Sequence, residues 1–188
     1  MNIALFASGK GTNVENILSC FSDNKKVNIL FIATNNLKSG AINHAKSYNI
    51  PLLTFKKLDL TNTNKLVDKL NNNRIELIVL AGFLLKIPEE FILQFNGKII
   101  NIHPSLLPKY GGKGMYGDHI HKEVLKNKEK ETGITFHFVN ENYDEGDYLF
   151  QRRVKLGKDE SIESIIKKIS SLEHTYYPQV IERFFLIK

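Results

Sequence analysis

The sequence predicts an α/β fold with a Rossmann-like open twisted sheet, mostly parallel, an antiparallel C-terminal strand, and helices on both faces. Three observations predict it. Short apolar runs recur through the first hundred residues, helical patterns separate them, and two alternating segments followed by a long amphipathic stretch occupy the second half. A length of 188 residues fits one domain.

The first half alternates two periodicities. The predicted strands are rich in Ile, Leu, Val and Phe, and they lie at 2–7, 27–34, 51–55, 76–83 and 98–102. Nearly continuous apolar runs of this length are typical of parallel strands covered on both faces. The predicted helices between them lie at 12–21, 39–48 and 61–73. Crossovers that join parallel strands in this way are right-handed in nearly all proteins.

The second half has a different pattern. A glycine-rich loop at 109–118 precedes a helix around 119–128. The two predicted strands at 132–141 and 148–156 are expected to pair antiparallel. A long amphipathic helix is predicted over 161–187, with Ser161 as its N-cap and Pro178 bending or dividing it. We therefore treat 1–188 as a single domain with halves at 1–100 and 101–188.

The composition is that of a soluble globular protein, with 42% hydrophobic and 24% charged residues. The net charge of +6 comes from scattered lysines, which indicates no nucleic-acid surface but favours an anionic ligand such as a phosphate. One cysteine allows no intrachain disulfide, and the first apolar run is too short to span a membrane. We expect a cytoplasmic protein without a membrane partner.

A glycine loop, SGKGTN at 8–13, follows the first predicted strand and opens a helix. Backbone amides at such a helix start can hold a phosphate. Val14 stands where the dinucleotide pattern requires its third glycine, and the P-loop pattern also fails. A small phosphate cradle at Gly11, Thr12 and Asn13 remains, and the alternative is a plain tight turn with Thr12 as the helix cap.

Asn101 and His103 interrupt the apolar run IINIHPSLLP at the end of the fifth predicted strand. Residues i and i+2 share one face of a strand, so the amide and the imidazole point the same way. Such a pair can stabilise an oxyanion and move a proton, although it can also simply close the strand. An acting imidazole usually has a carboxylate partner. The loop 140–147 offers four candidates, between which spacing does not choose: Glu141, Asp144, Glu145 and Asp147.

Five segments together resemble the phosphoribosylglycinamide formyltransferase family of folate-dependent enzymes. They are FASGKGTN, VLAGFLLKIP, IINIHPSLLPKY, TGITFHFVNENYDEGDYLFQ and EHTYYPQVI, and they occur in family order over nearly the whole chain. The loop 109–118 is longer than in many members, and Leu85 and Lys86 stand where the family has a basic and then an aliphatic residue.

The resemblance implies a role for each matching residue. Asn101, His103 and Asp144 match the catalytic trio, and Gly11, Thr12 and Asn13 match the cradle for the substrate's phosphate. The remaining matches are Gly82 beside the glycinamide chain, Glu173 at the ribose, and the folate-pocket residues Leu84, Leu85, Lys86, Ile87, Val139, Asn140 and Glu141. The resemblance thus makes 1–100 the phosphate-binding half and 101–188 the catalytic and folate-binding half.

The implied reaction is formyl transfer from 10-formyltetrahydrofolate to the amine of glycinamide ribonucleotide, in de novo purine (IMP) biosynthesis. The folate is a co-substrate, and no metal is expected because His119 and His121 point to different sides of a predicted helix. Two alternatives stay open: a hydrolase similar to 10-formyltetrahydrofolate deformylase, and a non-catalytic Rossmann-type nucleotide-binding module. The protein is expected to be a monomer or a homodimer.

Overall fold

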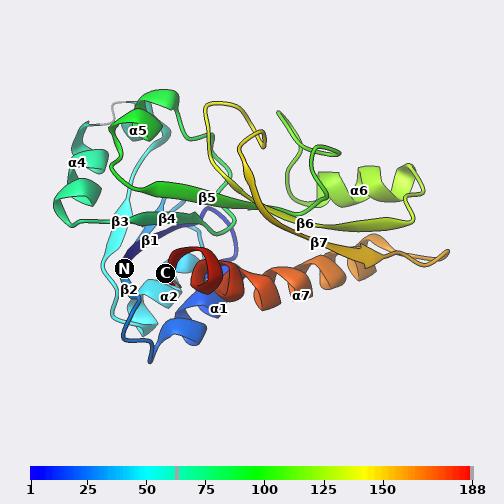
Figure 1. Cartoon of the computed structure of the whole chain (residues 1–188), viewed down its shortest axis with the longest axis horizontal. Coiled ribbons are helices and arrows are strands. Elements are labelled where there is room, and N and C mark those ends of the chain that lie inside the picture. The colour runs from blue at the N-terminus through cyan, green and yellow to red at the C-terminus, as the bar shows by residue number, and fades with distance from the viewer. Residues whose placement is uncertain (62–63, 187–188) are drawn as a thin grey trace. The chain divides into compact units, whose positions relative to one another are not determined.

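Two compact units make up the chain in the computed structural model, which describes residues 1–61 and 64–186. The first unit comprises Met1–Asn101 and the second Ile102–Ile187. Figure 1 labels the helices and strands of both. The predicted single domain with two halves remains a prediction, and each unit is described by itself below.

A parallel sheet forms the centre of the first unit. Its strands are β1 (Asn2–Phe6), β2 (Asn28–Thr34), β3 (Leu52–Thr54), β4 (Leu77–Leu80) and β5 (Lys98–His103), in the order β3-β2-β1-β4-β5. Every residue from Ile3 to Phe6 has an exposed fraction of 0%, and all four residues of β4 are buried. The predicted strands are therefore confirmed, and both faces of the central ones are covered.

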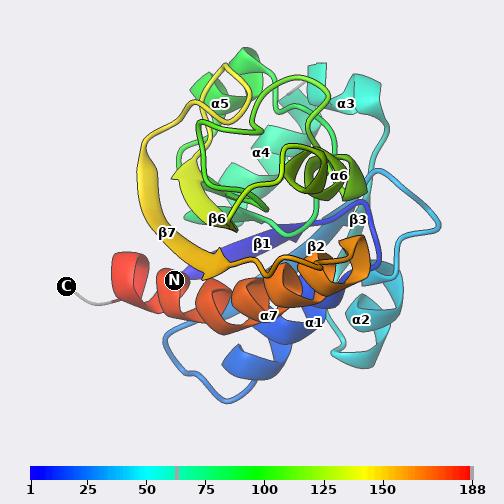
Figure 2. The ribbon, with the colours of Figure 1, turned by 90° about the vertical axis from the view of Figure 1, so that its right-hand side faces the viewer.

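Helices cover both faces of this sheet. They are α1 (Thr12–Phe21), α2 (Ala41–Ser47), α3 (Lys57–Thr61), α4 (Asn64–Asn72) and α5 (Glu89–Gln94). Figure 2 shows α1 and α2 on one face and α3, α4 and α5 on the other. The helix predicted at 61–73 matches α4, except that 62 and 63 lie outside the described residues. The sequence analysis missed α5, because six residues are too few for a helical period to stand out.

The second unit contains a helix-covered β-hairpin. Its elements are α6 (Asp118–Lys126), β6 (Glu131–Phe138), β7 (Tyr148–Lys155), α7 (Ile162–Ile181) and a π-helical end, η1 (Glu182–Leu186). β6 and β7 pair antiparallel as predicted, with Thr135 opposite Gln151, and α7 packs against both strands and α6.

The long helix α7 begins and ends for identifiable reasons. The Ser161 hydroxyl accepts a hydrogen bond from the backbone N–H of Ser164 at 3.1 Å, so the predicted N-cap is confirmed. Of the two predicted effects of Pro178, division of the helix is wrong, and a bend stays a prediction. α7 continues through Pro178 to Ile181, because buried Tyr177, Val180 and Ile181 hold this last turn despite the missing N–H. Residue 187 of the predicted helix lies outside the described residues.

The Thr135 hydroxyl organises the polar interior of the second unit. It donates to the Ser105 carbonyl at 2.8 Å and accepts from the backbone N–H of Leu107 at 3.1 Å and from Gln151 Nε2 at 2.9 Å. One donor and two acceptor positions are all that a hydroxyl has, so Thr135 is fully used. Because Thr135 and Ser105 are both 0% exposed, the chain after β5 is fixed to β6 without competition from water.

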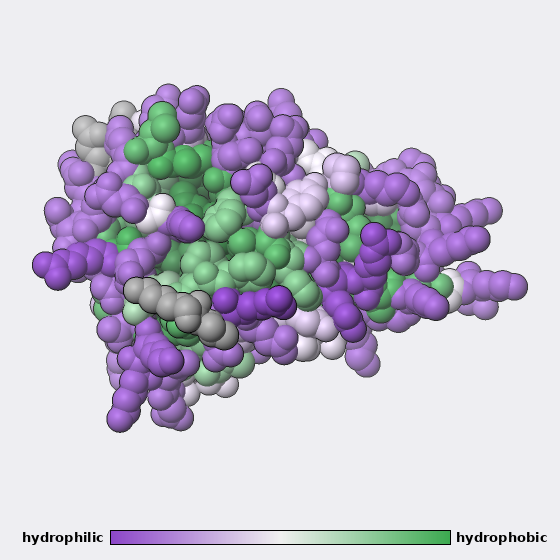
Figure 3. Space-filling model, in the orientation of Figure 1, coloured by the Kyte–Doolittle hydropathy of each residue, from purple (hydrophilic) through white to green (hydrophobic). Residues whose placement is uncertain are grey.

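Hydrophilic residues are spread over much of the surface in the view of Figure 3 rather than gathered in one place. This agrees with the scattered lysines of the sequence. Within residues 1–61 and 64–186, no helix has both the length and the apolar character needed to cross a bilayer.

Replacing Thr135 by Val tests whether this hydroxyl fixes the chain after β5. The change keeps the shape but leaves a buried carbonyl and a buried N–H without their partner, so we expect the free energy of unfolding to fall by about 1–3 kcal/mol. Urea unfolding measures it. Thr132→Val is the matched control. The Thr132 hydroxyl lies buried on the same strand and makes no hydrogen bond within the described part of the chain, so its loss should cost less than about 0.5 kcal/mol. Equal losses in the two variants would contradict this role of Thr135.

Candidate active site

The imidazole of His103 stands at the end of β5 and is almost completely buried, with 4% of the residue exposed. Pro104 follows at once and cannot donate a ladder hydrogen bond, so the strand ends there. The chain then turns through Ser105, whose hydroxyl donates to the Lys109 carbonyl at 2.8 Å. A turn tied in this way returns the backbone of residues 110–112 to the imidazole.

The loop between β6 and β7 supplies the carboxylate. Gly146 is needed there because a Cβ at this position would meet the Phe138 carbonyl oxygen at 1.8 Å. Asp144 adopts a left-handed backbone conformation, with φ 59°. The loop's other three acids, Glu141, Glu145 and Asp147, are exposed, whereas only 10% of the Asp144 side chain is. The structure thus separates Asp144 from the acids that spacing alone could not rank.

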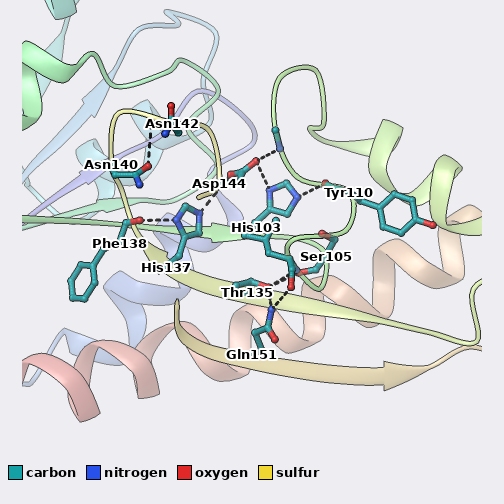
Figure 4. Close-up of polar contacts among 12 residues, drawn as sticks. His103, Ser105, Tyr110, Thr135, His137, Phe138, Asn140, Asn142, Asp144 and Gln151 are labelled. Carbon is teal, nitrogen blue, oxygen red and sulfur yellow. Dashed lines mark hydrogen bonds and ion pairs between the residues drawn. The ribbon is translucent and has the colours of Figure 1, made fainter. Parts of the chain in front are cut away.

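Two histidines flank the Asp144 carboxylate, one on each oxygen (Figure 4). His103 Nδ1 lies 3.4 Å from Oδ2, and His137 Nε2 lies 3.6 Å from Oδ1. The backbone N–H of Gly112 also donates to Oδ2 at 2.9 Å. Burial by itself raises the pKa of Asp144, but the hydrogen bonds from His103 and His137, the charge of His103 and the Gly112 amide outweigh burial and hold that pKa well below its usual range.

The outer contacts of the two rings decide which nitrogens carry protons. His103 Nε2 lies 2.7 Å from the Tyr110 carbonyl oxygen, and His137 Nδ1 lies 2.8 Å from that of Phe138. A carbonyl only accepts, so both of these nitrogens are donors. The nitrogen that faces Asp144 therefore carries a proton only in the positively charged form of each ring. One added proton can therefore lie between the Asp144 carboxylate and either of the two imidazoles.

Two further histidines lie on α6. His121 is buried and His119 is exposed, so the prediction that they point to different sides is confirmed. Burial lowers the pKa of His121 and outweighs the nearby charge of Asp118, which raises it. Among the residues that the structure describes, no group of three or more His, Cys, Asp or Glu side chains is placed to hold a metal ion.

The glycine loop starts α1 in the first unit, but Thr12 does not cap the helix. The N-cap residue is Gly11, with φ 82°, and a Cβ there would meet the Ala41 backbone N at 2.8 Å. Gly11 is thus required by close backbone packing and has no side chain to cover the first amides. Thr12 is exposed at the helix start, and Asn13 is buried. These amides remain suited to an anion.

The carboxyl ends of β1 and β4 are tied together beside this loop. The Ser8 N–H donates to the Gly82 carbonyl at 3.0 Å, and the Ser8 hydroxyl accepts from the Leu84 N–H at 3.1 Å. The Ser8 hydroxyl also donates to Asn35 Oδ1 at 2.6 Å. The glycine loop and the segment 82–87, which the sequence analysis treated as separate motifs, therefore form one connected edge of the first unit.

The other predicted ligand residues divide between the two units. After β4, Leu84 is 57% exposed, Lys86 is exposed, Leu85 is half-buried and Ile87 is buried. In the second unit, Val139, Asn140 and Glu141 begin the loop that carries Asp144, and Glu173 is half-buried on α7. Asn101 lies two residues before His103 on β5.

Sequence reasoning missed three contributors to the site. His137 is the first, because alternation along β6 cannot reveal a second histidine on the same carboxylate. Tyr110 and Gly112 act through backbone atoms, which leave no signal in residue type. His137 follows Thr135 by two residues on one strand, so the two side chains share a face. This spacing was the available hint that His137 lies near the site.

Comparison with known proteins places the chain among formyl transferases. The family model described as formyl transferase matches residues 1–181. A phosphoribosylglycinamide formyltransferase of Haemophilus influenzae is 34% identical over 97% of this chain and 86% of that protein. A chloroplastic protein of that name from Arabidopsis thaliana is 37% identical over 95% of this chain.

Solved structures agree with this assignment. Crystal structures of phosphoribosylglycinamide formyltransferase from Anaplasma phagocytophilum and of glycinamide ribonucleotide transformylase 1 from Geobacillus kaustophilus each have a TM-score of 0.87 at 30% identity. Each covers 97% of this chain, and the chain covers 85% and 97% of them. The α/β fold with a mostly parallel sheet and an antiparallel C-terminal strand is thereby confirmed.

The chain spans 63% and 59% of the length of the plant relatives from Arabidopsis thaliana and Vigna unguiculata. The family model nevertheless matches residues 1–181 of this chain. This range includes every residue of the candidate site and most of both units. The chain therefore belongs to the formyl transferase family.

Proposed function

We propose that the protein transfers a formyl group from 10-formyltetrahydrofolate to the amine of glycinamide ribonucleotide, a step of de novo purine biosynthesis. The observation that carries this proposal is the pairing of buried His103 with Asp144 at the end of β5. Together with Asn101, these residues match the catalytic trio of the family that the chain resembles. The names of the bacterial and plant relatives, phosphoribosylglycinamide formyltransferase, support the same reaction.

Attack of the amine nitrogen on the formyl carbon creates a tetrahedral oxyanion. The Asn101 amide is the proposed hydrogen-bond donor to this oxygen. The protonated imidazole of His103, whose two nitrogens face Tyr110 and Asp144, would stabilise it through its positive charge. Because His103 is buried, its charge is only weakly screened by water and acts strongly on the developing anion. Removing one donor of this kind costs about 3–4 kcal/mol in the barrier.

A proton must also leave the attacking amine and reach the departing folate nitrogen. Asp144 is proposed to pair with His103 and help move this proton, since its carboxylate stays ionised beside the imidazole. The proton is then passed to the folate nitrogen as the carbon–nitrogen bond breaks. The products are formylated glycinamide ribonucleotide and tetrahydrofolate, and no redox partner is needed.

The proposed substrate contacts are those that the family resemblance implies. The first-turn amides of α1, with Thr12 and Asn13, would hold the ribose phosphate, since the N-cap residue Gly11 leaves them uncovered. Glu173 would hold the ribose, and Gly82 would lie against the glycinamide chain. For the folate, the exposed side chain of Leu84 fits an aromatic ring system, and backbone at Leu85–Ile87 and Val139–Glu141 would hold its polar atoms.

Two alternatives lead to different behaviour. A deformylase-like hydrolase would use water in place of the amine and would need no phosphate cradle at Gly11. A non-catalytic nucleotide-binding module would leave the buried His103–Asp144 pair without a task, although burying such a pair is costly.

Cytoplasmic location and a metal-free reaction remain predictions from the sequence, and two plant relatives are named chloroplastic.

An amine-dependence assay tests the proposed function. Purified protein is mixed with 10-formyltetrahydrofolate, with and without glycinamide ribonucleotide, and release of tetrahydrofolate is followed by absorbance. We expect release only when the ribonucleotide is present, and mass spectrometry should find the formyl group on its amine. Equal release without the amine would support the hydrolase, and no release in either mixture would support the binding module.

Substitution of the paired residues tests their proposed roles. His103→Ala and Asp144→Asn should each lower kcat by about 100- to 1000-fold, since each removes charge stabilisation needed only during reaction. Asp147→Asn is the matched control, because Asp147 is an exposed acid of the same loop, and it should keep near-normal turnover. Circular dichroism checks that every variant is folded. A folded His103 or Asp144 variant with near-normal kcat would remove that residue from the mechanism.

A further inference from the structure

Tyr110 contacts the candidate active site through its backbone carbonyl, and it contacts an acid outside that site, Glu129, through its hydroxyl. It belongs to the β5 turn, which we define as residues 105–112. Its carbonyl oxygen accepts from His103 Nε2 at 2.7 Å, and its hydroxyl donates to Glu129 Oε1 at 2.9 Å. Figure 4 shows the carbonyl directed at the imidazole and the ring turned away from it. Glu129 lies between α6 and β6, and within the described part of the chain no hydrogen bond or ion pair joins it to His103.

The backbone of the β5 turn does not hold this geometry by itself. Tyr110 has φ 57°, a left-handed conformation that residues with a side chain adopt only when their surroundings impose it. Ser105 and Thr135 tie down the start of the turn, up to the Lys109 carbonyl. The conformation of Tyr110 itself needs a further support.

Packing does not provide that support. A pocket of about 280 Å³ lies beside the turn, lined by Leu107, Lys109, Tyr110 and Glu129 among others. A ring that borders open space is held less firmly than one enclosed on all sides. The Tyr110 hydroxyl has hydrogen-bond partners in the Glu129 carboxylate and the Asn127 side chain, and the charged Glu129 is the stronger of the two.

Glu129 is well suited to this task. Its hydrogen bonds from Lys109, the stronger influence, and from Tyr110 hold the pKa of Glu129 below its usual range, so it stays an ionised acceptor. A hydroxyl that donates to a carboxylate makes a stronger hydrogen bond than one between neutral groups. Lys109 Nζ lies 3.1 Å from the same oxygen, but 70% of its side chain is exposed. Water therefore screens this ion pair, and it contributes little to holding the turn in place, although it lowers the pKa of Glu129.

We propose that Glu129 and the Tyr110 hydroxyl are positioning residues for His103. They hold the Tyr110 carbonyl against Nε2, and so fix the imidazole plane with Nδ1 directed at Asp144. The same turn brings the Gly112 N–H to Asp144, so both members of the pair depend on it. The inference rests on the proposed function and extends it to two residues that touch neither reacting group.

The expected signature is kinetic. A looser imidazole spends less time in the reactive orientation, so kcat falls, whereas KM stays the same because other residues hold the substrates. Tyr110→Phe and Glu129→Ala should each lower kcat by about 10- to 100-fold with KM changed less than about twofold. Because both break the same hydrogen bond, the double variant should be no slower than the slower single variant.

Two comparisons separate positioning from general stability. Glu129→Gln keeps an oxygen that accepts from Tyr110, so its kcat should recover above that of Glu129→Ala. Glu123→Gln removes a half-buried carboxylate of α6 that, within the described residues, pairs with Lys126 of the same helix, and it should leave kcat unchanged. Thermal unfolding of all variants should show no relation between melting temperature and kcat. Additive losses, a rise in KM alone, or a kcat within twofold of wild type in Tyr110→Phe would overturn the proposal.

A second readout needs no turnover. In ¹⁵N-edited NMR spectra the Nε2 proton of His103 should exchange slowly with water in the wild type, because it is buried in a hydrogen bond. It should exchange faster in Tyr110→Phe and Glu129→Ala, but not in Glu123→Gln. Should the wild type transfer no formyl group, the proposed function fails while this exchange measurement still decides the role of Glu129. Equal exchange in all variants would refute the positioning role.

Discussion

One carboxylate, that of Asp144, holds together the chemistry of the second unit. It is met by two imidazoles and one backbone amide, which come from the end of β5, from β6 and from the β5 turn. Each donor belongs to a segment that must stay in place for the others to reach the same two oxygens. The arrangement of the strand end, the hairpin loop and the turn can therefore be understood as the support of a single buried charge.

That support includes local strain. Asp144 and Tyr110 both adopt left-handed backbone conformations that are uncommon outside glycine, with φ 59° and 57°. Such conformations persist only where neighbouring contacts impose them, and they concentrate at functional sites. Here the imposing contacts are the buried hydroxyl of Thr135 below the turn, the close approach of Gly146 to Phe138, and the Glu129 carboxylate. These contacts offset the free-energy cost of the two left-handed backbone conformations at the site.

Much of this architecture follows from the sequence by elementary rules. Apolar runs located β1 to β5, alternation located β6 and β7, and the Ser161 cap and the antiparallel hairpin were predictable from residue type and period. The failures have physical causes as well. α5 is too short to show periodicity, and Pro178 is tolerated because its turn is buried. Thr12 does not cap α1, because close packing on Ala41 puts Gly11 at the N-cap. Spacing could not choose Asp144 from four acids, since its selection depends on three-dimensional contacts to His103, His137 and Gly112.

The most direct test is the protonation of Asp144 itself, followed through its carboxyl ¹³C signal in NMR spectra of the folded protein as pH is lowered. Because its pKa is depressed, the carboxylate contributes stability above the ordinary aspartate pKa of about 3.9 and loses it as pH falls. We expect the signal to remain that of an ionised carboxylate at pH values near 3, where an aspartate with the ordinary pKa of about 3.9 is already taking up protons. A midpoint at or above the ordinary aspartate value would contradict the view that His103, His137 and Gly112 together hold this charge.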